Sequence, residues 1–149
     1  MRVLLALTLF ALSGCTTPAP EFTDYKGKDA ATFTRTRRAS PEGKAAQGVG
    51  VNIYEIDGRK PPRRDEEHRV APGERVFLIY AFDGTEARAQ GYVSFAAEPG
   101  KRYRIGATRP DNTWIYTVRF YEKTSDSEIE VATAELQAGM RVAIPVFVR

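Results

Sequence analysis

Residues 75–82 read Arg-Val-Phe-Leu-Ile-Tyr-Ala-Phe, an almost uninterrupted apolar run. The run is short and rich in β-branched and aromatic residues. Turn signals bound it, Pro72-Gly73 before it and Asp83-Gly84 after it. These features favour a strand over a helix. Because both faces of the strand are apolar, we expect it in the middle of a sheet.

Similar segments lie on both sides of this run. Alternation and composition predict strands over residues 31–38, 48–56, 87–97, 102–108, 114–121, 128–133 and 141–148, with a short one around 68–70. Such spacing is typical of an all-β domain. We therefore predict an antiparallel β-sandwich, immunoglobulin- or transthyretin-like, with about seven or eight strands. The pattern elsewhere lacks a helical period, although residues 132–138 allow a turn or two of helix.

Three segments carry more specific expectations. The strand over 31–38 is polar, so we place it at a sheet edge, where charge discourages unwanted pairing. Pro145 removes a backbone donor from the last strand, which also favours an edge. Trp114 has the same parity as Tyr116, Val118 and Phe120, and we assign all four to the core.

The N-terminus has the features of a secretory signal. Arg2 is followed by a ten-residue run, 3–12, that is apolar except for Thr8. A membrane-spanning helix needs about 20 apolar residues, whereas the apolar region of a signal peptide has about 7–15. The run ends in Leu12-Ser13-Gly14-Cys15, which resembles the lipobox of bacterial lipoproteins. The resemblance implies removal of residues 1–14, a diacylglyceryl group on the thiol of Cys15, and palmitate or a similar acyl chain on its amine.

Two observations agree with this anchor. Cys15 is the only cysteine, so the chain cannot use it in an intramolecular disulfide. The residues that follow are polar and proline-containing, as expected of a spacer between an anchor and a domain. We predict a flexible tether over residues 15–29, disordered or loosely laid on the domain surface, and a sandwich domain over 30–149. In enterobacterial lipoproteins an Asp after the lipidated cysteine favours inner-membrane retention. This chain has Thr16 there, so the resemblance implies an outer-membrane anchor facing the periplasm.

The charge of the chain says little about a partner. Its formal net charge of +3 is spread over 22 basic and 19 acidic residues. Nucleic-acid binding would need basic residues clustered on one face. We therefore predict no nucleic-acid partner.

The middle of the chain has an ordered series of turn motifs. Asp57-Gly58, Pro72-Gly73 and the run Ala97-Glu98-Pro99-Gly100-Lys101 mark successive corners. Over residues 50–107 this order resembles small β-sandwich lipoproteins and PEGA-like modules. The resemblance implies a fold and supplies no catalytic residue.

Catalytic and metal-binding motifs are not evident. His68 is the only histidine, and the only cysteine is expected to be acylated. A zinc site would have to rely on carboxylates, which is unusual. No serine stands in a G-x-S-x-G motif, so a nucleophilic elbow is also not indicated. We predict a protein that is not an enzyme and that has no metal and no cofactor.

Two features suit binding. Arg59, Lys60, Arg63 and Arg64 surround two prolines and form a candidate loop for lipid phosphates, lipopolysaccharide or an acidic partner. The alternative is a solvated loop, neutralised in part by the acidic residues 65–67. Tyr121, on the face opposite the core, is a candidate exposed aromatic for stacking on a sugar.

These observations lead to two functional hypotheses. The first is an anchored periplasmic module that binds an envelope protein or assists envelope assembly, through sheet edges that accept a partner strand. The second is a carbohydrate-binding module for peptidoglycan or another envelope glycan. Exposed aromatics in one groove would favour the glycan, whereas buried aromatics and an open edge would favour the protein.

Overall fold

The computed structural model describes residues 20–36, 49–62, 66–84, 88–110 and 113–139, together with the backbone of 141–144 and 147–148. This part of the chain contains no helix, and hence none that could cross a membrane. Its strands are β1 (Ala31–Arg35), β2 (Gly50–Ile56), β3 (Glu67–Val70), β4 (Gly73–Phe82), β5 (Arg88–Ala97), β6 (Arg102–Thr108), β7 (Ile115–Lys123), β8 (Glu128–Gln137), β9 (Arg141–Ile144) and β10 (Phe147–Val148).

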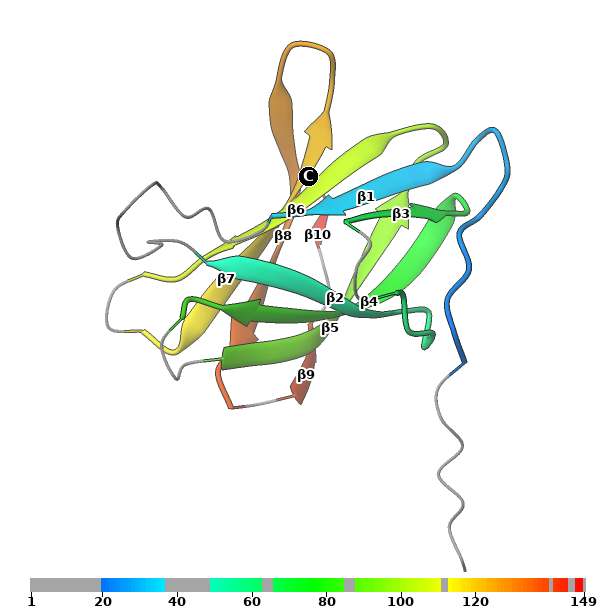
Figure 1. Cartoon of the computed structure of the whole chain (residues 1–149). Helices are drawn as coiled ribbons and strands as arrows, with labels where there is room; N and C mark the ends of the chain where they lie inside the picture. Colours follow the sequence, from blue (N-terminus) through cyan, green and yellow to red (C-terminus); the bar gives the residue numbers. More distant parts are fainter. Residues whose placement is uncertain are drawn as a thin grey trace, which may run out of the picture.

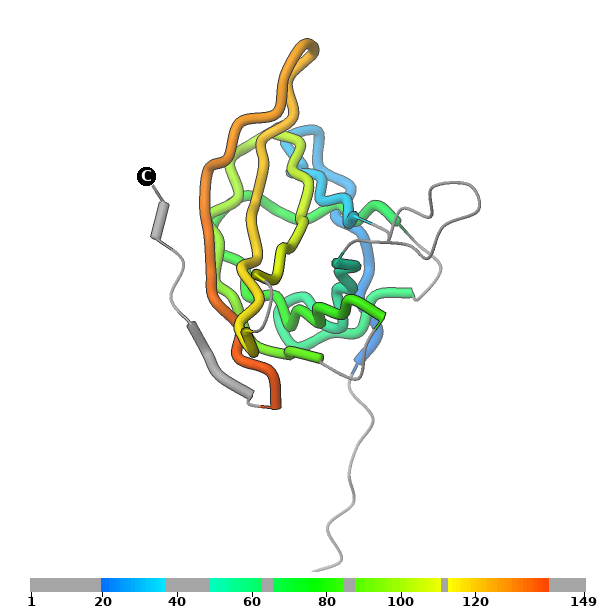
Figure 2. The backbone as a smooth tube through the Cα atoms, turned by 90° about the vertical axis from the view of Figure 1, so that its left-hand side faces the viewer, coloured from blue at the N-terminus to red at the C-terminus, as the bar shows by residue number. Residues whose placement is uncertain are grey.

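The strands form two sheets that pack as a β-sandwich (Figure 1). One sheet has six strands in the order β10-β8-β7-β6-β1-β3, and the other has four in the order β2-β4-β5-β9. Most neighbours are antiparallel, but β1 with β6 and β5 with β9 are parallel. In Figure 2, β7 and β8 (yellow and orange) form one wall of the molecule. The predicted all-β sandwich is confirmed.

Alternation along each strand fills the space between the sheets. Phe77, Ile79 and Ala81 of β4 are buried, as are Val93 and Phe95 of β5. Aromatic rings dominate this core: Phe95 stacks on Phe120 with ring centroids 4.6 Å apart, and Phe33 lies 4.8 Å from Phe77. The central position of β4 agrees with the expectation from its apolar run.

Residues 20–29 form a strap across one side of the sandwich, blue in Figure 2. The strap first pairs with the segment after β2: the N–H of Phe22 donates to the carbonyl of Lys60 at 2.8 Å, and the N–H of Lys60 donates to Pro20 at 3.0 Å. It then follows β3, where Tyr25 N–H donates to the Arg69 carbonyl at 2.9 Å. Residues 20–29 are thus laid on the domain by backbone hydrogen bonds. The structure does not describe residues 15–19.

The edge position expected for the first strand is wrong. β1 lies between β6 and β3, so β3 is the edge strand. The polarity of β1 has another cause: Ala31 and Phe33 are buried, while Thr32 and Thr34 face outward on the six-stranded sheet. An inner strand of a sandwich can be polar on its outer face.

Two further expectations fail for local reasons. Trp114 is 66% exposed, because β7 begins at Ile115 and the alternation of that strand does not extend to the residue before it. Tyr116, Val118 and Phe120 are in the core as expected. Residues 132–138 are not helical but continue β8, which buries alternate residues such as Leu136. The alanines and glutamates of β8 have high helix propensity, which tertiary pairing overrides.

The C-terminal segment belongs to two sheets. β9 lies at the edge of the four-stranded sheet and β10 at the edge of the six-stranded one, so the chain passes from one sheet to the other between them. The edge position expected for residues 141–148 is therefore confirmed. This division contributes to the ten observed strands, against the seven or eight expected.

Candidate functional site

An aromatic face covers the outside of the four-stranded sheet. We define it by Tyr54 of β2, Tyr80 and Phe82 of β4, and Tyr92 of β5. Tyr54 is 41% and Tyr92 is 40% exposed. Tyr80 contacts Tyr54 edge-on, with ring centroids 5.5 Å apart, and lies 5.6 Å from Phe82. A contiguous group of partly exposed aromatic side chains on a sheet surface is a candidate binding site.

Strand register places polar groups beside these rings. Tyr80 pairs with Asn52 on β2 and with Gln90 on β5, so a carboxamide flanks its ring on each side. In the next row Phe82 lies between Gly50 and Arg88. Directly opposed residues in a sheet have Cβ atoms about 4.5–5.5 Å apart, so these side chains are immediate neighbours.

The absence of a side chain at Gly50 leaves the space that the Phe82 ring occupies at this end of the face. A Cβ at position 50 would stand 2.6 Å from the Cζ atom of Phe82, too close for contact. A hollow of about 330 Å³ opens here, lined by Asn52, Tyr80, Phe82, Gly84 and Arg88. The hollow therefore combines an aromatic floor with an amide and a guanidinium group.

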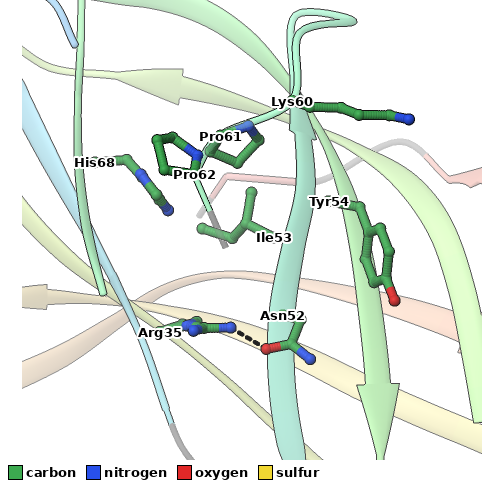
Figure 3. A pocket seen from close by; sticks show the side chains of 8 residues that line it. All are labelled: Arg35, Asn52, Ile53, Tyr54, Lys60, Pro61, Pro62 and His68. Atoms are coloured by element: carbon green, nitrogen blue, oxygen red, sulfur yellow. Dashed lines mark hydrogen bonds between the residues drawn. The ribbon is translucent and has the colours of Figure 1, made fainter. Parts of the chain in front are cut away.

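A second hollow, the β2–β3 pocket, lies on the other side of β2 and measures about 390 Å³ (Figure 3). Eight residues line it: Arg35, Asn52, Ile53, Tyr54, Lys60, Pro61, Pro62 and His68. His68 is 2% exposed and contacts the ring of Phe22 in the strap. The guanidinium of Arg35 donates to the side-chain oxygen of Asn52. Asn52 lines both hollows, so the aromatic face and the pocket form one continuous surface around β2.

The pocket has a basic lining. Arg35, Lys60 and His68 are basic, and none of the eight lining residues is a carboxylate. Lys60 is exposed, and no acid in the described part of the chain forms an ion pair with it. In Figure 3 its side chain extends past β2 on the side of Tyr54. This arrangement suits an anion, and it lacks the pair of carboxylates that glycoside hydrolysis uses.

The outer face of the six-stranded sheet has a different chemistry. Its side chains pair as ions, with Arg104 to Glu128 at 2.6 Å and Arg119 to Glu130 at 3.2 Å. Hydrogen bonds from Arg104 lower the pKa of Glu128 below its usual value. Such cross-strand pairs are typical of a solvated surface. The aromatic face is therefore a property of one sheet.

The structure places the candidate binding residues predicted from the sequence in different environments. Arg59 and Lys60 are exposed and follow a tight turn in which Asp57 and Gly58 both have positive φ. Tyr121 is half-buried, and the Arg104 guanidinium lies 4.2 Å from its ring centroid, so it is not the exposed stacking residue expected. Cys15, Arg63 and Arg64 lie outside the described residues.

The sequence reasoning missed the aromatic face. Its signal was present in the parity of Tyr54 and Tyr92, which alternate with buried neighbours such as Ile53 and Val93. Tyr54, Tyr80 and Tyr92 each stand at a position that a sandwich presents to solvent. The β2–β3 pocket had no comparable signal, since its walls come from four separate segments.

The edge strands are β3 and β10 in one sheet and β2 and β9 in the other, and two of them, β3 and β2, are covered or interrupted. Along β3, the strap binds Arg69 through Tyr25 and also through the Asp24 carboxylate, which accepts from Arg69 N–H at 3.0 Å. On β2, the N–H of Val51 donates to the Thr36 carbonyl at 3.2 Å. β2 also contains a bulge after Ile53, which interrupts its edge. Covered or bulged edges are poor templates for an added strand.

Within the described ranges, no three potential metal ligands come together. No family model, curated protein or solved structure matches the chain. The geometry of this surface is therefore the basis on which a function can be inferred.

Proposed function

We propose that the chain is a non-enzymatic, lipid-anchored envelope protein that binds a glycan through the aromatic face. The anchor is Cys15 in the outer membrane, with the domain in the periplasm. The lipobox and the preceding apolar run support the anchor. The single observation that carries the binding function is Tyr80, which lies between the carboxamides of Asn52 and Gln90 on an outward sheet face.

This combination suits a sugar for chemical reasons. A pyranose ring offers C–H groups on one face, which pack against the negatively charged face of an aromatic ring. Its hydroxyls need donors and acceptors beside that ring, and a carboxamide supplies both. Tyr54 and Tyr92 extend the surface on the Leu78 side of the Tyr80 row. Phe82 extends it on the opposite side, so several sugars of one glycan chain can be contacted.

A protein partner that adds a strand is less well supported. That mode needs an exposed row of backbone donors and acceptors. Two of the four edge strands are poorly suited to it, because the strap covers β3, and β2 is bonded at Val51 and bulged after Ile53. The aromatic face meets the condition set for a glycan, namely exposed aromatics gathered on one surface.

Binding to purified peptidoglycan sacculi tests the proposal. The probe is the mature chain, residues 15–149 with Cys15→Ser, measured by co-sedimentation. Each lost ring contact is worth about 0.5–1.5 kcal/mol, so Tyr80→Ala and Tyr92→Ala should each weaken binding about two- to tenfold.

Trp114→Ala is the matched control, because Trp114 is 66% exposed but lies next to β7 of the other sheet. It should bind sacculi as the parent does. If the two tyrosine variants bind as well as the parent, or if Trp114→Ala weakens binding equally, the aromatic face is not the glycan site.

Metabolic labelling with palmitate tests the anchor separately. The parent chain should incorporate label and remain with the outer-membrane fraction, because two or more acyl chains hold a protein stably in a bilayer. Cys15→Ser should lose both properties. Label retained by Cys15→Ser would contradict acylation at this residue.

A further inference from the structure

The strap fixes where the chain enters the domain. Pro20 accepts a hydrogen bond from Lys60 at 3.0 Å, and Glu21 pairs with Lys60 as a parallel bridge. Pro20 is the fifth residue after Cys15 along the chain. A fully extended chain advances at most about 3.6 Å per residue, so Pro20 lies within about 18 Å of Cys15.

This limit orients the domain, provided that Cys15 is acylated as proposed. Lys60 is held beside Pro20 and therefore lies close to the lipid surface. The β7–β8 hairpin points away from the entry of the chain (Figures 1 and 2). The Lys60 end, with the β2–β3 pocket, is thus the membrane-proximal end, and the hairpin is the distal end.

The chemistry at this end matches an anionic lipid headgroup. Arg59 and Lys60 are both exposed, and Asp57 beside them is already paired with Arg75 at 3.0 Å. Pro61 and Pro62 add apolar walls to the basic lining of the pocket. A headgroup presents a phosphate next to glycerol carbons, so it can contact both kinds of wall.

Carboxylates near the Lys60 end would repel the phosphate of a headgroup and so weaken its binding. Asp57 and Glu55 precede Arg59 by two and four residues, and Glu66 and Glu67 directly precede His68. None of these acids lines the pocket, and neither does Glu21 on the strap. Glu21 is exposed beside Lys60 through their backbone bridge. Removing its charge should therefore strengthen the contact.

From these observations we infer that the β2–β3 pocket and the adjoining Arg59 and Lys60 form a membrane-facing site for the phosphate of an anionic phospholipid headgroup. The inference rests on the proposed anchor for its orientation. The pocket shares Asn52 and Tyr54 with the glycan surface, but the exposed cations that carry the inference, Arg59 and Lys60, lie outside the aromatic face. The site would hold the domain against the bilayer and present the β7–β8 hairpin to the periplasm.

Vesicle co-sedimentation tests the inference with the Cys15→Ser mature chain. Vesicles containing phosphatidylglycerol should bind it, vesicles of phosphatidylcholine alone should not, and salt should weaken binding. A basic residue near an anionic bilayer contributes about 1 kcal/mol to binding, so Lys60→Ala should weaken vesicle binding about fivefold. Glu21→Gln should strengthen binding.

Lys28→Ala is the matched control, because it removes the same charge from an exposed residue near the other end of the strap. It should bind vesicles as the parent does. If Lys28→Ala and Lys60→Ala weaken vesicle binding equally, the loss reflects net charge alone, and the proposed site at Lys60 is wrong. Equal binding to phosphatidylcholine vesicles would also overturn it.

A soluble phosphate distinguishes the source of the ligand. Glycerol 3-phosphate, at the phosphate concentration of the vesicles, should leave the NMR signals of His68 and Lys60 in place, whereas phosphatidylglycerol vesicles should perturb them. Saturation by glycerol 3-phosphate alone would overturn the lipid assignment. The assay contains no glycan and no acylated protein, so its failure is distinct from failure of the sacculus or palmitate experiments.

Discussion

Two groups of aromatic side chains occupy opposite faces of the same two strands. Phe77 of β4 and Phe95 of β5 point inward, where they are less than 5% exposed and pack against rings from the other sheet. Tyr80 of β4 and Tyr92 of β5 point outward, with Tyr92 40% exposed. Both groups lie on strands with the same backbone pairing, so their environments differ only in which face of the sheet they occupy. The inner group excludes water and holds the sheets together, whereas the outer group has no packing task that requires its rings.

The largest effect is expected from the inner group. Phe33 is fully buried and contacts Phe77, Phe95 and Tyr103. Phe33→Ala should lower the free energy of unfolding by about 3–5 kcal/mol, because it removes buried area and leaves a cavity. Urea denaturation measures this change. A loss below about 1 kcal/mol would show that the inner rings are not the principal core.

A glycine substitution sharpens the comparison, because it moves an outer ring without removing it. Gly50→Ala places a Cβ where the Phe82 ring lies, so the ring must shift. The stability cost should be on the order of 1 kcal/mol, and sacculus binding should fall. Denaturation and co-sedimentation of the same sample measure the two effects.

Gly106→Ala is the control, on the outer face of the other sheet. Its new Cβ would meet the flexible end of Arg104, 2.9 Å away, which can move aside. Sacculus binding should not change. If Gly50→Ala also leaves binding unchanged, the position of Phe82 is not important to the site.

Substitution of an outer tyrosine should weaken sacculus binding with little effect on the stability of the fold. Tyr92 is 40% exposed, so Tyr92→Ala should change the free energy of unfolding by less than about 1 kcal/mol, while binding weakens as stated above. Thermal denaturation checks the first part. A destabilisation as large as that of Phe33→Ala would mean that the outer rings also hold the fold.

The smallest effect concerns the charged face of the other sheet. Hydrogen bonds from Arg104 lower the pKa of Glu128, so this carboxylate stabilises the folded state above its unfolded pKa, and the contribution is lost as pH falls through the folded pKa. Because both side chains are partly exposed, Glu128→Gln should cost only about 0.5 kcal/mol at pH 7. Urea denaturation at pH 7 and at pH 3 should show this difference shrinking at the lower pH.

Glu135→Gln is the matched control on the same strand, since Glu135 is exposed and has no ion pair within the described residues. It should change stability less than Glu128→Gln at pH 7. Equal effects of the two substitutions would assign the loss to general charge on β8 and not to Arg104.

The sequence predicts the inner group well and the outer group poorly. The alternation around Val93 and Phe95 is clear, and it places both residues in the core as observed. In β4 both faces are apolar, so periodicity alone does not say that Tyr80 and Phe82 face solvent. That distinction depends on which faces of the two sheets meet.

Other differences between expectation and structure come from long-range pairing. The strap has a polar, tether-like composition, and only its hydrogen bonds to Lys60 and Arg69 reveal that it is part of the domain. β8 was partly missed because its alanines favour a helix in isolation. The β2–β3 pocket joins residues from β1, β2, β3 and the segment after β2, which no local pattern connects.

The most direct test of the glycan site is an NMR titration of the mature Cys15→Ser chain with soluble peptidoglycan fragments. The account predicts shifts in the signals of Tyr54, Tyr80, Tyr92 and the side-chain amides of Asn52 and Gln90. The signals of Trp114 and Tyr121 should stay in place. Shifts confined to the six-stranded sheet, or no shift at saturating fragment, would contradict the assignment of the aromatic face as the glycan site.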